Sequence, residues 1–527
     1  MTDQVSSFID RLTEIRTPPF TLQDLEGFPW NEYSERISVY EEAENWYSGA
    51  ILDTTKTRSG QEVEQYPVKI NPIKAGVQKH TFALFGEVEE DDSPLVDPKV
   101  VFTDDTQKKL AEEAEEVLSQ IWWESNGRAV QWKNAAISQV YGGCVFKASF
   151  DPYDALRSIK LRIESIHPKY FVGRPDAGDM FRLREAWIVK PISQEEALEL
   201  GYTGGFTDEF EVPYHTEHWT LRTFRTWVQN QPLTRQTTDG ESIPLSGANP
   251  YGFVPLVYIP HIRVDGFYGE NFFDSVKGII RELNLRVADF GDAVTADAHA
   301  YMGMRNVQGS ADIITLAPGV NAIDLGSTMS MTGNESAPDL WDLRKARASE
   351  SMATLVDWLY NQYRRDAFVP KVADGEDEGS QRSGLTLAMR MLSLLWHIQN
   401  ERVFWTTGLN LFNRMLLHMC FIKDQLRETT GIGQSHTALR IRQDWSPVLP
   451  RDREMLVNEV VARMGAKLGS PQTLLDILGD IQDPDEEIKR IIEFAEEIAE
   501  AETVQQPQPT RQNVSAGTPS SGAKSSE

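Results

Sequence analysis

Apolar residues recur at helical spacing in several separate parts of the chain. In 31–50 they follow three- and four-residue steps, and residues 66–86 begin extended and become helical after Pro72. A pair of helices follows at 105–139, broken by an Asn-Gly dipeptide. Steps of three and four residues place apolar side chains on one face of a helix. The first quarter of the chain therefore predicts mainly helices, preceded by a proline-containing arm over 1–30.

Alternating and continuous apolar runs then replace the helical spacing. Between about 140 and 262 such runs are separated by Asp-Pro, Gly, Pro and Ser-Gly turn dipeptides and residues. This pattern is typical of β-strands, and it predicts a meander of antiparallel strands. Three tryptophans of the preceding helix pair are expected in the core, because indole rings bury large areas. They are Trp122, Trp123 and Trp132.

The pattern changes sharply at residue 271, where a long helix with one narrow apolar stripe is predicted. The stripe consists of Phe273, Val276, Ile280, Leu283, Val287, Phe290 and Val294. The opposite face carries Lys277, Arg281, Arg286, Asp289 and Asp292. A helix over 271–298 would be about 42 Å long at about 1.5 Å per residue. A narrow stripe suits packing against a neighbouring helix, either within one bundle or in another subunit.

A small β insert separates this helix from a second one. Residues 301–343 contain short apolar strands punctuated by glycine and Pro-Gly. The second helix is expected at about 345–366, with its own stripe of Met352, Leu355, Leu359 and Tyr363. Two long helices joined by a compact insert predict an antiparallel hairpin with a folded tip.

A glycine-rich loop follows the hairpin at 368–384. Its tip is acidic and its flanks are basic: the residues are Lys371, Asp374, Glu376, Asp377, Glu378 and Arg382. Residues 385–426 lack proline and predict one very long helix. Beyond 447 shorter helices are expected, one of them capped by Ser470 ahead of Pro471. Residues after about 503 contain almost no apolar side chains and are expected to be disordered.

Composition narrows the range of functions. The chain has 527 residues, of which 40% are apolar and 25% charged, so it can bury a real core and form several structural units. Its formal net charge is −27. A generally basic clamp for nucleic acid is excluded, because phosphate binding requires cations that replace counterions. No signal peptide and no run of 18 apolar residues is present, so no membrane span is expected.

Candidate catalytic motifs are missing from the sequence. No glycine is followed by lysine, which excludes a phosphate-binding GxxxxGK[ST] loop, and HExxH, CxxC and GxSxG are absent. His215 and His218 lie on an expected strand, where a spacing of three points them to opposite faces. Acidic residues at 87–92 are interpreted as a solvated loop, although they leave a two-metal nuclease open. Cys144 and Cys420 cannot form a disulfide framework.

The order of elements resembles one family, the portal proteins of tailed bacteriophages, most closely those of siphophages. Residues 249–294, NPYGFVPLVYIPHIRVDGFYGENFFDSVKGIIRELNLRVADFGDAV, are similar to the strand, glycine-rich turn and stem-helix start of that family. Arg382-Ser383-Gly384 before a long helix resembles the end of its tunnel loop. Residues 468–497 resemble its C-terminal helical segment. The resemblance covers about 30–500 and rests on the joint order of these segments.

The resemblance implies an α+β portal fold with long stem helices, a β-rich wing, a small α/β clip insert and a helical crown. The implied parts are a wing at 1–270, a first stem helix at 271–300, a clip at 301–344, a second stem helix at 345–366, a tunnel loop at 367–384, a long wing helix and return at 385–446, a crown at 447–502 and a disordered tail at 503–527.

The function implied by the resemblance is a ring of usually twelve copies at one capsid vertex of the virion, assembled in the host cytoplasm. Terminase pumps double-stranded DNA in through the ring, and the DNA later leaves through the tail. The implied partners are further copies of the chain, the major capsid protein and scaffold, the terminase large subunit, a head–tail adaptor and weakly held DNA, without a membrane. No catalytic residue, cofactor or metal site is implied, and the ATPase belongs to the motor.

The negative charge fits a ring that does not grip DNA. Phosphate contacts create affinity, so an acidic wall lets the duplex slide and keeps it near the axis. We expect the acidic loop tip to line the narrowest part, with Lys371 or Arg382 touching phosphates transiently. The stripe from Phe273 to Phe290 would pack stem helices together. Two other hypotheses remain: a metal-dependent nuclease built from acidic clusters, and a capsid adaptor that forms no ring.

Overall fold

The computed structural model describes most of the chain. The described residues are 27–52, 55–58, 61–64, 68–86, 94–102, 105–152, 154–206, 212–236, 242–244, 246–263, 265–298, 301–305, 313–317, 320–324, 339–342, 350–374, 384–448, 453–478 and 487–494. They contain both helices and sheets, as expected for an α+β protein. The chain divides into two compact units, Met1–Pro450 and Arg451–Glu527.

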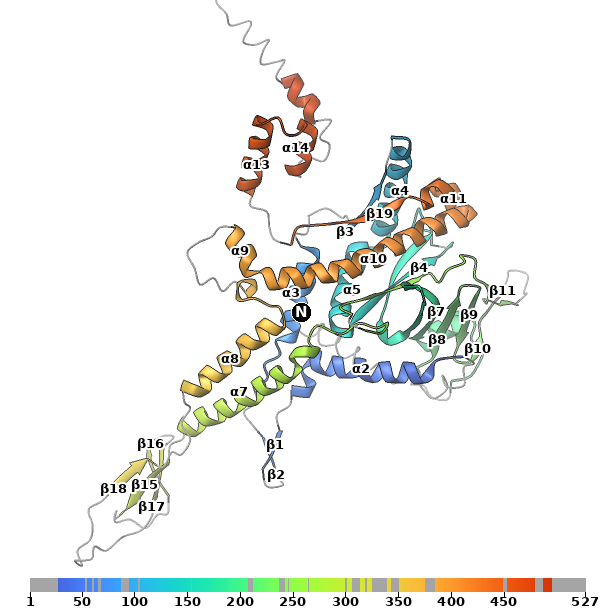
Figure 1. Cartoon of the computed structure of the whole chain (residues 1–527). Coiled ribbons are helices and arrows are strands. Elements are labelled where there is room, and N and C mark those ends of the chain that lie inside the picture. Colours follow the sequence, from blue (N-terminus) through green and yellow to red (C-terminus); the bar gives the residue numbers. More distant parts are fainter. Residues whose placement is uncertain are drawn as a thin grey trace, which may run out of the picture. The chain divides into compact units, whose positions relative to one another are not determined.

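One long helix, α10 (Leu392–Ile422), runs through the main core of the first unit (Figure 1). Its buried residues include Trp405, Leu409, Phe412 and Leu416, which recur at steps of three and four and so share one face. The elements that surround this face are α3 (Ile73–Phe85), α4 (Asp105–Glu124), α5 (Gly127–Tyr141), β14 (Leu256–Pro260) and the pair formed by β3 (Val96–Val101) and β19 (Arg440–Trp445).

The described strands between 140 and 262 form two larger sheets and one two-stranded pair, so the predicted antiparallel meander is found only within the second sheet, where five consecutive strands pair in chain order. The first sheet has the order β14-β4-β5, with β4 at Gly143–Phe150 and β5 at Leu161–Ile166. Every residue of β14 is buried, as are the first six of β4. Strands that are apolar on both faces need cover on both, and β14, which pairs with β4 along one edge, also contacts α10 and β7.

The second sheet has the order β10-β9-β8-β7-β6. Its strands are β6 (Phe171–Asp176), β7 (Asp179–Pro191), β8 (Tyr214–Thr220), β9 (Thr223–Val228) and β10 (Gln231–Pro232), with β13 (Gly247–Ala248) beside β9. Helix α2 (Trp30–Ser48) packs its Tyr33 and Ile37 against Trp187 of this sheet. The remaining short elements of this region are α6 (Gln194–Glu199), η3 (Pro168–Tyr170) and the pair β11 (Thr234–Gln236) and β12 (Ser242–Pro244).

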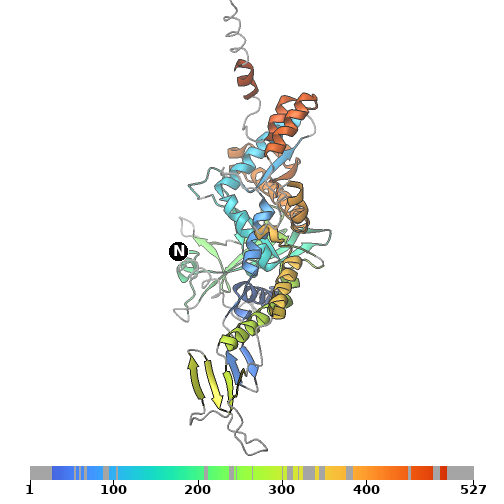
Figure 2. The same cartoon turned by 90° about the vertical axis from the view of Figure 1, so that its left-hand side faces the viewer.

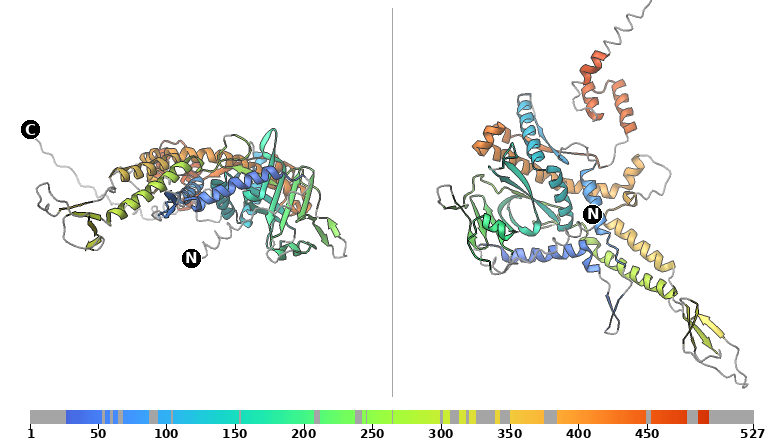
Figure 3. Two further views of the ribbon diagram at one scale, coloured as in Figure 1. Left: turned by 90° about the horizontal axis from the view of Figure 1, so that it is seen from below. Right: turned by 180° about the vertical axis from the view of Figure 1, so that it is seen from behind.

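Two helices, α7 (Lys277–Ala298) and α8 (Glu350–Asp366), lie side by side (Figures 1 and 3). The predicted start of α7 at 271 is wrong by six residues, because a 3₁₀ turn, η4 (Asp274–Val276), precedes the helix. Between α7 and α8 the described residues form a sheet of order β16-β17-β15-β18, visible in Figure 2, with β15 and β17 parallel. Its strands are β15 (Tyr301–Arg305), β16 (Ile313–Ala317), β17 (Val320–Asp324) and β18 (Asp339–Asp342). No helix occurs in the described part of this insert.

The single helix predicted over 385–426 is divided. The structure has α9 (Gly384–Arg390), α10 and α11 (Asp424–Thr430) in its place. At the second break Lys423 is extended, with φ −84° and ψ 116°, and its ammonium group lies 5.2 Å from the ring centre of Phe150 and 5.4 Å from that of Tyr251. This cation–π contact ties the residue at the break to Phe150 of β4 and to Tyr251. Such a tertiary contact leaves no local pattern in the sequence. The short α12 (Gln434–Thr437) follows.

The tryptophan prediction is correct for one of three residues. Trp122 is buried, and its indole N–H donates to Asn413 at 2.8 Å. Trp123 and Trp132 are 56% and 39% exposed and lie beside Leu156 in a pocket of about 950 Å³. Trp123 follows Trp122 directly on α4, and adjacent helical residues point about 100° apart. One face of α4 therefore cannot bury both rings.

The second unit contains α13 (Arg453–Gly465) and α14 (Pro471–Leu478), and residues 487–494 are helical. Ser470 lies just before α14, where its hydroxyl accepts from the N–H of Thr473 at 3.2 Å. This contact is the predicted cap. Residues 479–486 lie outside the described residues, as does the tail at 503–527. None of the described helices is both long enough and apolar enough to cross a membrane.

Candidate functional site

The base of α7 is buried within its own chain. Phe273, Val276 and Ile280 are fully buried in a cluster with residues of α2, α3 and α8, among them Trp46 and Tyr363. Leu283 is also buried, whereas Val287 and Phe290 are half-buried and Val294 is 45% exposed. The apolar stripe thus has two parts. Its first half fills the core of the monomer, and its second half becomes progressively exposed.

The charged residues of α7 also find partners within the chain. Arg286 contacts Glu282 at 2.7 Å and Asp289 at 3.0 Å. Lys277 contacts Glu42 of α2 at 2.8 Å. The guanidinium of Arg281 lies 5.5 Å from the ring centre of Trp46, and Asp292 is exposed. The charged face opposite the apolar stripe therefore already makes contacts within the monomer.

Asn284 fastens α7 to the segment before α3. Its side-chain carbonyl accepts from the N–H of Ile70 at 2.8 Å, and its amide donates to the carbonyl of Ile70 at 2.9 Å. The same amide donates to the carbonyl of Ile280 at 2.9 Å. The side chain is 1% exposed. One buried amide therefore satisfies both backbone groups of a residue that is 214 positions away in the sequence.

The segment after α8 leaves the helix through a strained turn. Phe368 has φ +54°, a left-handed conformation that non-glycine residues rarely adopt. The N–H of the next residue, Val369, returns to the carbonyl of Arg364 at 2.9 Å, and Val369 is buried. The His80 ring donates to the carbonyl of Ala367 at 2.8 Å. The beginning of the predicted loop is thus fixed by the core beneath it.

Most of the predicted loop residues lie outside the described part of the chain. Lys371 is partly exposed in η5 (Lys371–Asp374). For Asp374 only the backbone is described, and Glu376, Asp377, Glu378 and Arg382 lie outside the described residues. Their role in lining a tunnel stays a prediction.

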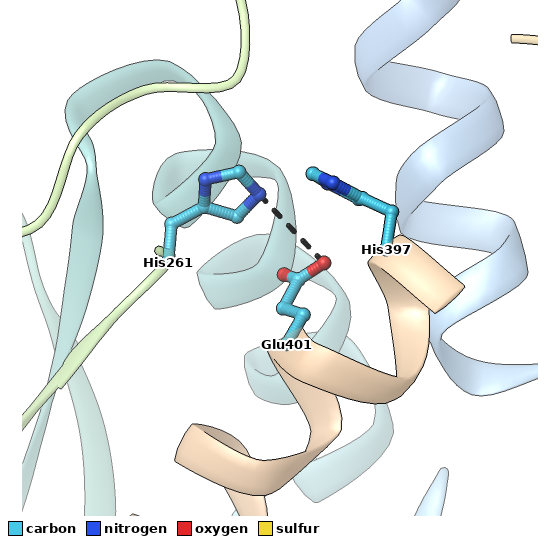
Figure 4. A group of neighbouring side chains, drawn as sticks. All are labelled: His261, His397 and Glu401. Carbon is cyan, nitrogen blue, oxygen red and sulfur yellow. Dashed lines mark ion pairs between the residues drawn. The ribbon is translucent and has the colours of Figure 1, made fainter. Parts of the chain in front are cut away.

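A buried group of polar side chains lies next to this turn (Figure 4). His261 follows β14, and His397 and Glu401 stand one turn apart on α10. Each offers a ligand atom within 4.8 Å of those of the other two. Burial raises the pKa of Glu401 to about 8 and lowers that of His397 to about 4. The pKa of His261 is lowered well below its usual range, also by burial.

Sequence reasoning missed this group. The signal was the spacing of four between His397 and Glu401, which places both side chains on one face of a helix. That face is the apolar, buried one, where a histidine and a glutamate are unusual. His261 comes from a strand 136 positions earlier than His397, and nothing local indicates that the fold brings it to α10. By contrast, the pair His215 and His218 stays separate: His218 contacts Glu185 at 2.9 Å and stacks on Trp187.

A row of exposed apolar residues follows α9 and the first half of α10. Met389, Leu392, Trp396 and Val403 are 66%, 41%, 62% and 62% exposed. On α10, spacings of four and seven place Leu392, Trp396 and Val403 on one face, whereas Met389 lies on α9 before the break. On α8, Leu355 and Trp358 are likewise 41% and 58% exposed. Leu392, Trp396 and Val403 are named here the exposed apolar row, and they are poorly covered by the described part of the chain.

Comparison with known proteins assigns a family. The family described as phage portal protein, SPP1 Gp6-like, matches residues 205–501, which is more than half of the chain. No curated protein matches the sequence. The matched residues include α7, α8, the sheet between them and α10, as well as both long segments, 249–294 and 468–497, on which the sequence resemblance rested.

Proposed function

The chain belongs to the SPP1 Gp6-like family of phage portal proteins, and from this premise we propose that it is one subunit of a DNA-conducting ring at a capsid vertex. Portal proteins are in general structural and non-enzymatic, and they form oligomeric rings associated with the virion capsid. In this proposal about twelve copies close the ring, a number taken from the family. Terminase packages double-stranded DNA through it, and the DNA leaves through a head–tail adaptor into the tail.

The exposed apolar row is the observation that supports a ring most directly. Isolated apolar side chains are common on protein surfaces, but contiguous apolar patches mark contact sites. The row presents Trp396, and tryptophan is enriched among residues that dominate binding energies. A contact between this row and a different face of the next copy is heterologous, and such contacts close into rings when the rotation fits.

The parts of the chain take the following roles in this proposal. The hairpin of α7 and α8 is the stem, the sheet β15–β18 is the clip, and the second unit belongs to the crown. Residues 1–270 together with α10 form the wing, and 367–384 form the tunnel loop. The acidic residues of that loop, from Asp374 to Glu378, repel phosphates, so the duplex slides without being held.

One comparison of variants tests the ring. Trp396→Asp places a charge in the exposed apolar row, and Leu198→Asp does the same at a residue of α6 that is 56% exposed. We expect annular particles in negative-stain images of the wild type and of Leu198→Asp, and none for Trp396→Asp. A wild type that never forms an annulus, alone or with capsid components, refutes the ring. Annuli formed by Trp396→Asp would refute only this choice of interface.

The loop is tested separately from the ring. Replacing 374–378 with glycine and serine should leave annuli intact and should alter DNA packaging or retention. Unchanged packaging and retention would remove the loop from the mechanism.

A further inference from the structure

The group formed by His261, His397 and Glu401 is enclosed in the protein. His261 and Glu401 are inaccessible to solvent, and His397 is 6% exposed. The Nε2 atom of His261 lies 3.8 Å from a carboxylate oxygen of Glu401, which is too long for a hydrogen bond. The three side chains therefore converge without a hydrogen bond among them, and the dashed line in Figure 4 marks the 3.8 Å ion-pair distance between His261 and Glu401.

The tautomer of His261 leaves a lone pair directed into this group. Its Nδ1 lies 3.1 Å from the carbonyl oxygen of Glu270. A carbonyl only accepts, so Nδ1 carries the proton and Nε2 carries the lone pair. That Nε2 is buried and makes no hydrogen bond, and the same holds for Nε2 of His397. Histidines that bind metals in proteins usually donate their other ring N–H to a carbonyl or carboxylate in this way.

Glu401 completes a donor set of one carboxylate and two imidazoles. Its two oxygens accept from the amide of Gln139, each at 3.0 Å, and each retains room for a further partner. The neighbouring Arg402 makes no ion pair with it: that guanidinium donates to the carbonyls of Leu84 and Ser446, and its charge acts on Glu401 only from beyond ion-pair distance. A buried carboxylate without a cation is costly. Burial raises the pKa of Glu401 and lowers the pKa values of both histidines.

We propose that His261, His397 and Glu401 bind one divalent transition-metal ion, with Zn²⁺ as the best fit. Two imidazole nitrogens and one carboxylate oxygen suit zinc, whereas Ca²⁺ and Mg²⁺ prefer oxygen ligands. Tetrahedral ligands at about 2.1 Å from zinc lie about 3.4 Å apart. Closing the present spacing of 3.8 to 4.8 Å needs only small side-chain rotations. Oε1 of Gln139, which is buried and unpartnered, offers an acceptor for a water in the fourth position.

The ion would join segments that are distant in the sequence at the base of the helix hairpin. It would link the end of β14, which leads toward α7, to α10. The ring of His397 also contacts His80 and Phe368, with ring centres 4.8 and 4.7 Å apart, and His80 bonds to the end of α8 through Ala367. The site is thus a structural cross-link, and it does not depend on ring formation or on DNA passage.

Metal content and cobalt spectroscopy test the site on the full chain. Because the group is buried, the ion has to enter during folding, so the protein is produced with added zinc and purified without chelators. A second sample is unfolded with EDTA and refolded with Zn²⁺ or Co²⁺. We expect about one zinc ion per subunit, and a Co²⁺ absorption spectrum typical of a four- or five-coordinate site. The zinc-refolded protein should also unfold at a higher temperature than protein refolded without metal.

Variants identify the ligands. Glu401→Gln and His397→Gln keep size and should lower the zinc content to about one tenth or less, since each removes a ligand. His418→Gln, on the same helix but outside the group, is the matched control and should keep the ion. If a variant fails to fold, the wild-type zinc content and Co²⁺ spectrum decide. A wild type that carries no zinc by either route, or variants that retain it, would overturn the proposal.

Discussion

Replacing Asn284 with alanine should loosen the joint between α7 and the segment before α3. The wild-type side chain makes three hydrogen bonds of 2.8 to 2.9 Å, two to Ile70 and one to the carbonyl of Ile280. Each hydrogen bond contributes about 1 kcal/mol net, which gives about 3 kcal/mol for the three. The carbonyl of Ile280 still accepts within the helix, which lowers the sum. The N–H and carbonyl of Ile70 lose their partners in the variant, which raises the expected loss of stability.

The assay combines urea unfolding with hydrogen exchange. A loss of about 3 kcal/mol corresponds to about two powers of ten in an equilibrium constant. The amide of Ile70 should therefore exchange up to about 100-fold faster in Asn284→Ala, and the unfolding midpoint should fall. Amides in the distant sheet β14-β4-β5 should change less, since they make no contact with this joint.

A matched variant separates the hydrogen bonds from the general effect of removing an amide. Asn361 on α8 is half-buried and has no side-chain hydrogen bond in the described part of the structure. Asn361→Ala should change the unfolding midpoint little. Equal effects of the two substitutions, together with unchanged exchange at Ile70, would refute the reasoning that Asn284 carries the joint.

Two further predictions concern the body of the first unit. Gly86 has φ +76°, and a Cβ there would lie 2.2 Å from the carbonyl oxygen of Pro447, so Gly86→Ala should cost about 2–4 kcal/mol in urea unfolding, while Gly178→Ala, with open space around it, should be nearly neutral. Lys147 and Glu217 form a buried pair at 2.7 Å. Burial alone would raise the pKa of Glu217 and lower that of Lys147, but their attraction reverses both shifts. The stability that Glu217 contributes is therefore present above its ordinary pKa of 4.5 and is lost as the pH falls through its lowered pKa. The stability that Lys147 contributes is present below its ordinary pKa of 10.5 and is lost as the pH rises through its raised pKa. The double variant Lys147→Met/Glu217→Leu should remove the contributions of this pair to the fall of the unfolding free energy at low pH and at high pH. An unchanged dependence of the unfolding free energy on pH would show that the pair does not cause these losses.

Local periodicity in the sequence located most helices but not the partners of the strands. The helices α2, α4, α5, α7 and α8 lie within a few residues of their predictions, because each carries its own apolar face. Strand pairing depends on residues far apart: β14 returns to β4 across more than a hundred residues. Strand pairing therefore depends on which surfaces the fold brings together, which no short window of sequence contains.

The buried histidines show this limit most clearly. Nothing in the neighbourhood of His261 differs from an ordinary strand end, and its meaning comes only from α10 beside it. A spacing of four on the buried face of α10, from His397 to Glu401, was the one local sign. Buried polar residues on an apolar face are costly unless something compensates them. Such residues are therefore a better guide to hidden sites than the spacing of histidines alone.

The apolar stripe of α7 cannot distinguish packing within a chain from packing between chains. Its period is uniform from Phe273 to Val294, yet the first half is buried by α2, α3 and α8 and the last residue is 45% exposed. A substitution such as Leu283→Asp would therefore destabilise the monomer as well as any assembly, and loss of rings in that variant would not locate an interface. The exposed apolar row avoids this ambiguity, because Trp396 is already 62% exposed in the monomer. A charge there costs the isolated chain little, so an effect on assembly has to arise from contact with another copy.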